Sequence, residues 1–174
     1  MWEPKEHFTS QHTVENGSQS LTLSIKTFMA RIKIDLPAHV QFQTTVTVRI
    51  SDLNYGNHVG NDSILTIIHE GRMQFLRHLG FKDELNLEND IGIIIADAAV
   101  VYKAESFYAD RLNIEISTDD FSKYGFDMYY KITREESGKE VARGKTGIVC
   151  MDYKERKIAN IPERLLTALR DQEL

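Results

Sequence analysis

A single helical repeat stands among segments that otherwise follow the two-residue period of β-strands. From Ser63 to Leu79, apolar side chains recur at steps of three and four residues, and Gly80 follows where a glycine cap would end the helix. Residues 40–50 alternate apolar and polar side chains and predict a half-buried strand. Strand-like patterns return after the helix, at residues 91–101, 112–118, 126–133 and 141–151.

This order of elements predicts the fold class. The last three strand segments are separated by short turn-like sequences and predict an antiparallel meander, and the sequence after Pro162 predicts a short amphipathic helix. One long helix among strands can bury its apolar stripe only against their sheet. We therefore expect an α+β fold in which an antiparallel sheet of about five strands wraps around one long central helix.

The strand segment at residues 91–101 is apolar at both alternating positions. That pattern is typical of a strand covered on both faces, so we expect it deep in the sheet. Its charged residue, Asp97, would then be a buried carboxylate that needs a partner such as Arg72 or Lys103. Because Arg72 falls on the apolar side of the helix, it is itself expected in a buried or interfacial ion pair.

The composition fits one globular domain with a polar extension. Hydrophobic residues make up 41% and charged residues 27% of the 174 residues, near the average for globular proteins. Residues 1–28 are mostly polar and lack periodicity, which predicts a flexible N-terminal extension before a single domain at residues 29–174. The formal net charge of -5 gives no overall positive field, so we expect neither nucleic acid nor a membrane as a partner.

The chain has one cysteine, Cys150, so an intrachain disulfide is excluded and the cytoplasm is the expected location. The thiol lies in an apolar strand segment without a neighbouring base, which predicts an inert core residue. The apolar runs are too short to span a bilayer, and the first twenty residues lack the order of a secretory signal. The sequence has no phosphate-binding loop, dinucleotide fingerprint or Cys/His metal spacing, so we expect no metal and no cofactor.

The loop at residues 52–61, between the first strand and the helix, is the stretch best suited to chemistry. Its glycines, Gly56 and Gly60, allow the backbone to approach a ligand closely. The helix that follows presents unpaired N–H groups and the positive end of its dipole, a place that suits an oxyanion. An ordinary turn that caps a helix would have the same composition.

The order of motifs around this loop resembles the acyl-thioester hydrolases of the hotdog superfamily, with the 4-hydroxybenzoyl-CoA thioesterase-like branch as the nearest match. The resemblance rests on Asp-x-Asn-x-x-x-His-Val-x-Asn at residues 52–61, Glu-x-Arg at residues 70–72 and the later Phe-Leu and Gly, and it covers about residues 42–151. It implies a hotdog fold and hydrolysis of an acyl thioester of coenzyme A or acyl-carrier protein, with coenzyme A present only as part of the substrate. It also implies a homodimer whose sheets join edge to edge, or a homotetramer of two such dimers, with each active site between one subunit's loop and its partner's helix.

The resemblance also implies roles for single residues. Glu70 would act as general base or nucleophile, and His58 would polarise the thioester carbonyl together with backbone amides of the loop. Many relatives carry the catalytic aspartate at the position of Asn54, and an amide can neither attack a thioester nor take a proton from water. Substrate contacts are expected from the other loop residues, Asp52, Tyr55, Gly56, Asn57, Val59, Gly60 and Asn61, of which Val59 and Gly60 would supply the amides.

The amide at position 54 leaves two functions open. In the first, Glu70 carries the chemistry, Asn54 orients substrate or water, and the protein is an acyl-CoA thioesterase. In the second, hydrolysis has been lost and the protein binds acyl-CoA or acyl-carrier protein without turnover. A hydratase or dehydratase on the same fold is a third class, but it would usually require a paired His and Asp. Glu70 as a solvated helix residue and His58 as a structural hydrogen-bonding residue are the plainer interpretations of the two side chains.

Overall fold

The computed structural model describes residues 11–12, 23–24 and 32–171. The chain divides into two units, residues 1–32 and 33–174. In the first unit, β1 (Gln11–His12) pairs antiparallel with β2 (Leu23–Ser24). The expected extension at residues 1–28 lies largely outside the described residues, so its flexibility and its boundary at residue 29 stay predictions.

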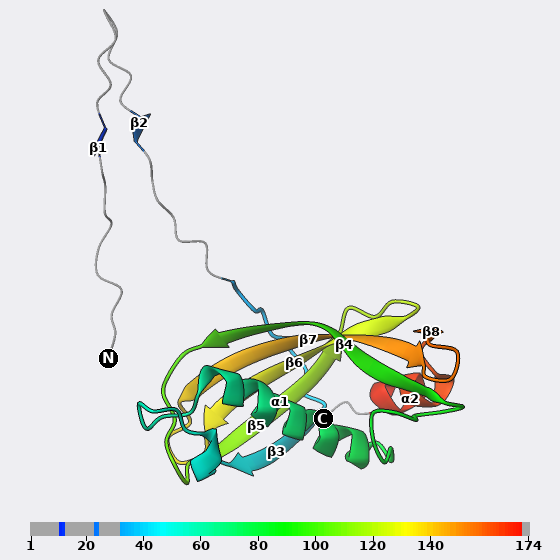
Figure 1. The fold of residues 1–174 in the computed structure, drawn as a ribbon, viewed down its shortest axis with the longest axis horizontal. Helices are drawn as coiled ribbons and strands as arrows, with labels where there is room; N and C mark the ends of the chain where they lie inside the picture. The colour runs from blue at the N-terminus through cyan, green and yellow to red at the C-terminus, as the bar shows by residue number, and fades with distance from the viewer. Residues whose placement is uncertain (1–10, 13–22, 25–31, 172–174) are drawn as a thin grey trace, which may run out of the picture. The chain divides into compact units, whose positions relative to one another are not determined.

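The second unit is built on a six-stranded sheet in the order β3-β5-β6-β7-β4, with the short β8 paired to the end of β7 (Figure 1). The sheet is antiparallel throughout, and α1 (Asn61–His78) lies across one of its faces (Figure 1). The predicted α+β fold and the meander are therefore confirmed. The strands are β3 (Phe42–Thr47), β4 (Ile91–Tyr102), β5 (Arg111–Asp119), β6 (Gly125–Arg134), β7 (Glu140–Asp152) and β8 (Lys157–Ile158), of which β8 was not predicted.

Helix α1 packs closely on the sheet because a glycine lies beneath it. The side chain of Ile68 fills the space above Gly144 of β7, where an added Cβ would overlap the Ile68 Cδ1 atom. The helix ends as predicted, with Gly80 in the left-handed region at a φ of 84°. The side chains that face the sheet are almost completely buried and include Ile64, Ile67, Ile68, Phe75 and Leu76.

Strand β4 lies at the edge of the sheet, so the prediction that it lies deep inside is wrong. Among the described strands it pairs with β7, and its middle residues, Ile95–Ala98, are exposed. The register of the β4–β7 pair shifts between Ile95 and Asp97. The Asp97 side chain is 64% exposed and lies 3.9 Å from the Lys145 ammonium, so the predicted buried pairing with Arg72 or Lys103 is also wrong. The apolar pattern belongs to an edge strand that is covered at its start, where Ile93 N–H donates to the Glu84 carbonyl at 2.8 Å, and exposed in its middle.

The expected buried ion pair of Arg72 is confirmed, with Glu84 as its partner. Arg72 is 5% exposed, and its Nε donates a hydrogen bond to Glu84 Oε1 at 2.6 Å. Burial alone lowers the pKa of Arg72, but the interactions with Tyr130 and Glu84 outweigh it and the pKa is raised. The fully buried Tyr130 hydroxyl in turn lies 3.1 Å from Thr146 Oγ1. This core network joins the helix, two strands and the connection before β4.

The predicted C-terminal helix is confirmed as α2 (Glu163–Arg170), which begins directly after Pro162. Leu165 and Leu169 are its buried residues, and the Gln41 amide donates to the Leu169 carbonyl at 2.7 Å. Within the described ranges, neither helix is long and apolar enough to cross a membrane. The cytoplasmic location stays a prediction.

Cys150 is buried in β7, and this burial raises the pKa of its thiol to about 11. The prediction that Cys150 is a core residue is confirmed.

Candidate active site

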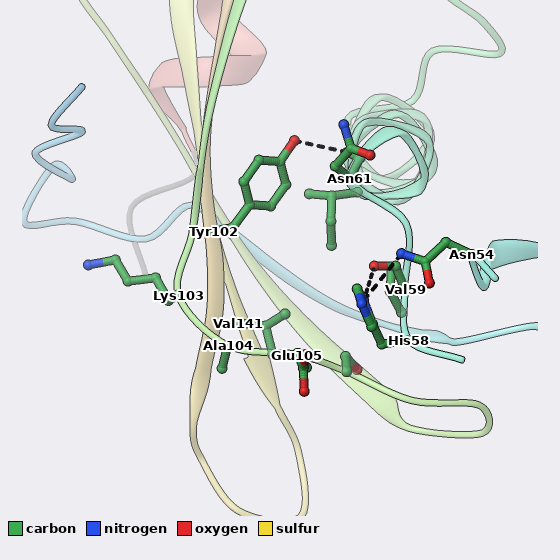
Figure 2. A pocket seen from close by; sticks show the side chains of 11 residues that line it. Asn54, His58, Val59, Asn61, Tyr102, Lys103, Ala104, Glu105 and Val141 are labelled. Atoms are coloured by element: carbon green, nitrogen blue, oxygen red, sulfur yellow. Dashed lines mark hydrogen bonds between the residues drawn. The ribbon is translucent and has the colours of Figure 1, made fainter. Parts of the chain in front are cut away.

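A cavity of about 310 Å³ opens between the loop that precedes α1 and the end of β4 (Figure 2). The loop and the first turns of α1 contribute Asn54, His58, Val59, Asn61 and Ile64. The facing wall was missed by sequence reasoning because it lies far along the chain and carries no local motif. It consists of Tyr102, Lys103, Ala104, Glu105, Ser106 and Val141.

The tip of the loop is a tight turn closed by Asn54. The backbone N–H of Asn54 donates to the His58 carbonyl at 2.9 Å, and the Asn54 carbonyl accepts from Asn57 N–H at 3.1 Å. Asn57 adopts a φ of 61°, a conformation that asparagine tolerates in turns. Tyr55, Gly56 and Asn57 are exposed at this tip and are not part of the cavity lining. Three of the predicted substrate contacts therefore lie at the rim of the loop and not inside the cavity.

The side chains of Asn54 and His58 are brought together, as Figure 2 shows. Asn54 Oδ1 accepts a hydrogen bond from Gly56 N–H at 2.8 Å, and Asn54 Nδ2 lies 3.4 Å from His58 Nδ1. The same His58 nitrogen lies 3.2 Å from the Val59 carbonyl oxygen. The imidazole is half-buried and borders the cavity.

The expected use of the Val59 and Gly60 amides requires a correction, because both are already paired. Val59 N–H donates to the Ser106 carbonyl and Gly60 N–H to the Asp52 carbonyl, each at 2.9 Å. Gly60 is the N-cap, so α1 begins at Asn61, and the N–H groups of a first helical turn have no acceptor within the helix. Asn61 borders the cavity, and its carbonyl accepts a hydrogen bond from the Tyr102 hydroxyl at 3.0 Å. The donor closest to the predicted role is therefore the N–H of Asn61.

Asp52 serves the turn before the loop. It is 4% exposed and ends a short 3₁₀ turn at Ile50–Asp52, where its Oδ2 accepts from Arg49 N–H at 2.7 Å. The carboxylate also lies 3.5 Å from the Arg49 guanidinium. These contacts stabilise the turn, and because Asp52 does not border the cavity, the structure does not place this predicted substrate contact at the site.

Glu70 lies outside the cavity of its own chain. It stands nine positions after Asn61, which corresponds to about 13.5 Å along the helix axis. Its exposed carboxylate accepts from the Gln74 amide at 2.8 Å, and Gln74 accepts in turn from the Thr44 hydroxyl of β3. The carboxylate is therefore held on the flank of α1 that faces β3, and one chain does not bring Glu70 and His58 together.

Two charged residues of the facing wall were absent from the sequence-based candidates. The Lys103 ammonium lies 3.8 Å from Glu140 Oε1, and in Figure 2 the Lys103 side chain extends away from the loop. Glu105 places a carboxylic side chain on the cavity lining. The position of its backbone is fixed, because its carbonyl accepts from Arg134 Nη2 at 2.6 Å.

Asp110 holds the segment that follows Glu105. Its Oδ2 accepts from Ser106 Oγ and from Phe107 N–H, each at 2.8 Å, and forms an ion pair with Arg134 at 2.9 Å. Burial alone raises the pKa of Asp110, but the two hydrogen bonds and the Arg134 charge outweigh it, so the pKa lies below its usual range. Because the Ser106 carbonyl also binds Val59 N–H, Asp110 keeps the two walls of the cavity in contact.

Residues 48–169 match a family described as the thioesterase-like superfamily. The chain belongs to this superfamily. The match confirms the family and the hotdog-type fold that the sequence predicts, and it confirms a thioester hydrolase at the level of the family.

Named members of the superfamily are similar over most of their length. A 1,4-dihydroxy-2-naphthoyl-CoA hydrolase from Synechocystis is 27% identical over 126 residues, which are 71% of this chain and 91% of that protein. The enzyme of the same name from Acaryochloris marina is 28% identical over 125 residues, again 71% of this chain and 91% of the relative.

Two solved structures show the same fold. The crystal structure of a 1,4-dihydroxy-2-naphthoyl-CoA thioesterase from Synechocystis has a TM-score of 0.69 at 26% identity, over 75% of this chain and 96% of that one. A gentisyl-coenzyme A thioesterase has a TM-score of 0.64 at 21% identity, over 72% of this chain and 98% of the other, and at this identity it supports the fold alone.

Across residues 32–171 of the thioesterase-like unit, the structure brings together no group of three or more His, Cys, Asp or Glu side chains that could hold an ion. The polar groups that border the cavity include the Asn54 amide, the His58 imidazole, the N-terminus of α1 and the Glu105 carboxylate, a set that suits acyl transfer.

Proposed function

We propose that this protein is an acyl-CoA thioesterase that hydrolyses a thioester to a free acid and a thiol. The observation that carries the proposal is the cavity at the N-terminus of α1, bordered by Asn54, His58 and Asn61. The relatives named as coenzyme A thioesterases support coenzyme A as the thiol carrier, ahead of acyl-carrier protein. The acyl group would enter the cavity between the loop and Tyr102.

The thioester carbonyl oxygen would bind at the start of α1. The first-turn N–H of Asn61 and the imidazole of His58 would donate to it, and the positive end of the helix dipole would stabilise the charge that develops on the oxygen. Water then attacks the carbonyl carbon and loses one proton to a base. The carbon–sulfur bond breaks, and the departing thiolate is protonated.

Two carboxylates are candidates for that base. Glu70 is the residue expected from the family resemblance, and it would have to act on a carbonyl bound by a different copy of the chain. Glu105 has the advantage of bordering the cavity that holds His58 and Asn61 in the same chain. Asn54 cannot take the proton, because an amide is not a base at neutral pH.

A homodimer is part of the proposal, with a homotetramer of two dimers as the larger form. The support comes from β4, a twelve-residue strand with β7 on one side and exposed apolar residues such as Ile95 in its middle. A second β4 could pair with this edge, and natural proteins rarely leave such an edge uncovered.

The test compares two matched isosteric variants, Glu70→Gln and Glu105→Gln. Each variant keeps the shape of the side chain and removes the base. Thiol release is measured for wild type and both variants with short, medium, long and aromatic acyl-CoAs, and light scattering reports the mass of each protein. We expect the variant that lacks the base to lose at least ~100-fold in kcat, the scale of a general base, while the other stays within about threefold.

The same thiol-release measurements distinguish the two candidate bases from each other and hydrolysis from binding alone. Loss in Glu70→Gln alone identifies the residue expected from the family, and loss in Glu105→Gln alone identifies the carboxylate of the cavity. If wild type releases no thiol from any acyl-CoA but binds them, hydrolysis is overturned in favour of the non-catalytic binding protein that the amide at Asn54 allows.

A further inference from the structure

We propose that Asn54 sets the tautomer of His58, so that Nε2 carries the proton and the imidazole acts toward substrate as a hydrogen-bond donor. The amide at position 54 would then change the role of the histidine, instead of marking a lost site. The part concerning substrate rests on the proposed function. The tautomer itself is a property of the protein without substrate.

The orientation of the Asn54 amide is fixed by the loop. Its Oδ1 is occupied by the hydrogen bond from Gly56 N–H at 2.8 Å, so Nδ2 is the end that lies 3.4 Å from His58 Nδ1. An amide nitrogen can only donate. His58 Nδ1 can accept this donor only if it carries no proton, and in the neutral ring the proton is then on Nε2.

The Val59 carbonyl, 3.2 Å from the same His58 nitrogen, would favour the opposite tautomer. The two contacts exclude each other, because the carbonyl accepts and the Asn54 amide donates. The outcome is decided by which group tolerates the loss of its partner. Folded proteins leave carbonyl oxygens without a partner more readily than N–H groups, and the Asn54 Nδ2 has no other acceptor within the described part of the chain.

The Nε2 edge of His58 stays open because residue 56 is a glycine. A Cβ added to Gly56 would lie 3.2 Å from His58 Nε2 and 3.1 Å from Asn54 Oδ1. Both distances are tighter than ordinary contacts, so a side chain would crowd the nitrogen and the amide that orients the ring. Figure 2 shows the Nδ1 edge of the ring turned toward Asn54 and Val59. The arrangement therefore holds one edge of the imidazole and leaves the other for a ligand.

This assignment separates two roles that a histidine can play in acyl transfer. An Nε2–H donates to a carbonyl oxygen that becomes negative, whereas an unprotonated Nε2 would take a proton from water. An aspartate at position 54 would accept from Nδ1–H and stabilise the second arrangement. With asparagine, His58 donates and the base must be a carboxylate.

The first experiment reads the tautomer directly. The full chain is labelled with ¹⁵N-histidine, and long-range proton–nitrogen correlation spectra are recorded at pH 8 without ligand, with the His58→Gln spectrum as the means of assignment. We expect the proton on Nε2 in wild type and on Nδ1 in Asn54→Asp, with the other histidines unmoved. A wild-type proton on Nδ1, or a tautomer that does not change in Asn54→Asp, overturns the proposal.

The second experiment reads the donor role with two matched variants. The amide nitrogen of glutamine can occupy the place of Nε2, whereas the shorter asparagine cannot reach it. We expect His58→Gln to retain at least ~10-fold more kcat than His58→Asn at similar KM, a difference of about 1.4 kcal/mol in transition-state stabilisation. Equal losses in both variants overturn the donor role. If the spectra are as expected and wild type hydrolyses no acyl-CoA, the proposed function fails while the tautomer assignment stands.

Discussion

The core network around Arg72 and the cavity around His58 use the same kinds of polar groups in opposite ways. In the core network, Arg72 donates to Glu84 and the Tyr130 hydroxyl meets Thr146, so the polar atoms are paired with each other. In the cavity, no hydrogen bond within residues 32–171 reaches the Glu105 carboxylate or His58 Nε2. Paired polar groups hold a fold together, whereas groups held in place but left unpaired are available to a ligand.

The largest effect on stability is expected when the core network is broken. Arg72→Met removes the guanidinium but keeps an unbranched side chain, and it leaves Glu84 and Tyr130 beside an apolar group. We expect the free energy of unfolding to fall by about 3 kcal/mol, because one partner of a buried pair is removed. Urea denaturation measures the change.

An exposed ion pair provides the control for that variant. Arg111 pairs with Glu135, and their side chains are 61% and 48% exposed. Arg111→Met is expected to cost less than about 1 kcal/mol. An equal fall in the free energy of unfolding in the two variants would mean that burial does not make the Arg72 ion pair more important than an exposed one.

An intermediate effect is expected at Asp110, which links the two walls of the cavity. Its lowered pKa means that the folded state favours the ionised form, so its contribution is present above the ordinary aspartate range and is lost as the pH falls through the folded pKa. We expect Asp110→Asn to destabilise the protein by about 2 kcal/mol at pH 7. Thermal unfolding at pH 7 and pH 3 should show the gap between wild type and variant shrinking in acid, and a gap that is the same at both values would contradict this account.

The smallest effect on stability is expected at the tip of the loop. The Tyr55 side chain is fully exposed, so Tyr55→Ala should change the free energy of unfolding by less than about 0.5 kcal/mol. A rise in KM for acyl-CoA with kcat unchanged would show that Tyr55 contacts the substrate. An unchanged KM would remove it from the predicted contacts.

The hydrophobic periods in the sequence were sufficient to predict the helices and strands, but not which strands lie next to each other in the sheet. Helix α1 and the meander follow from spacing, and both were predicted. The pattern of residues 91–101 was misinterpreted because apolar side chains on both faces do not distinguish a central strand from an edge that another chain covers. The side chain of Asp97 is exposed together with its neighbours in the middle of this edge strand, and no sequence signal marked the register shift beside it.

The candidate site was predictable on one side of the cavity. The loop from Asn54 to Asn61 carries a compact motif, whereas Tyr102 and Glu105 reach the cavity through the pairing of β4 with β7. The Val59 and Gly60 amides were offered as donors because their partners, the carbonyls of Ser106 and Asp52, cannot be identified from spacing. Sequence reasoning therefore finds groups that could act and cannot tell which of them the fold has already used.

The order of strands in the sheet also implies an order of assembly. The strands β5, β6 and β7 pair residues that are close in sequence, such as Asp119 and Asp127. Strands β3 and β4 instead pair with residues far away in sequence, Phe42 with Ile116 and Ile91 with Asp152. Closing long loops costs more entropy, so we expect the meander to form first and the two flanking strands to join later. The two walls of the cavity follow these late-forming strands, because the loop comes after β3 and the facing wall lies at the end of β4. Pulse-labelled hydrogen exchange during refolding should accordingly find the meander protected before the cavity exists.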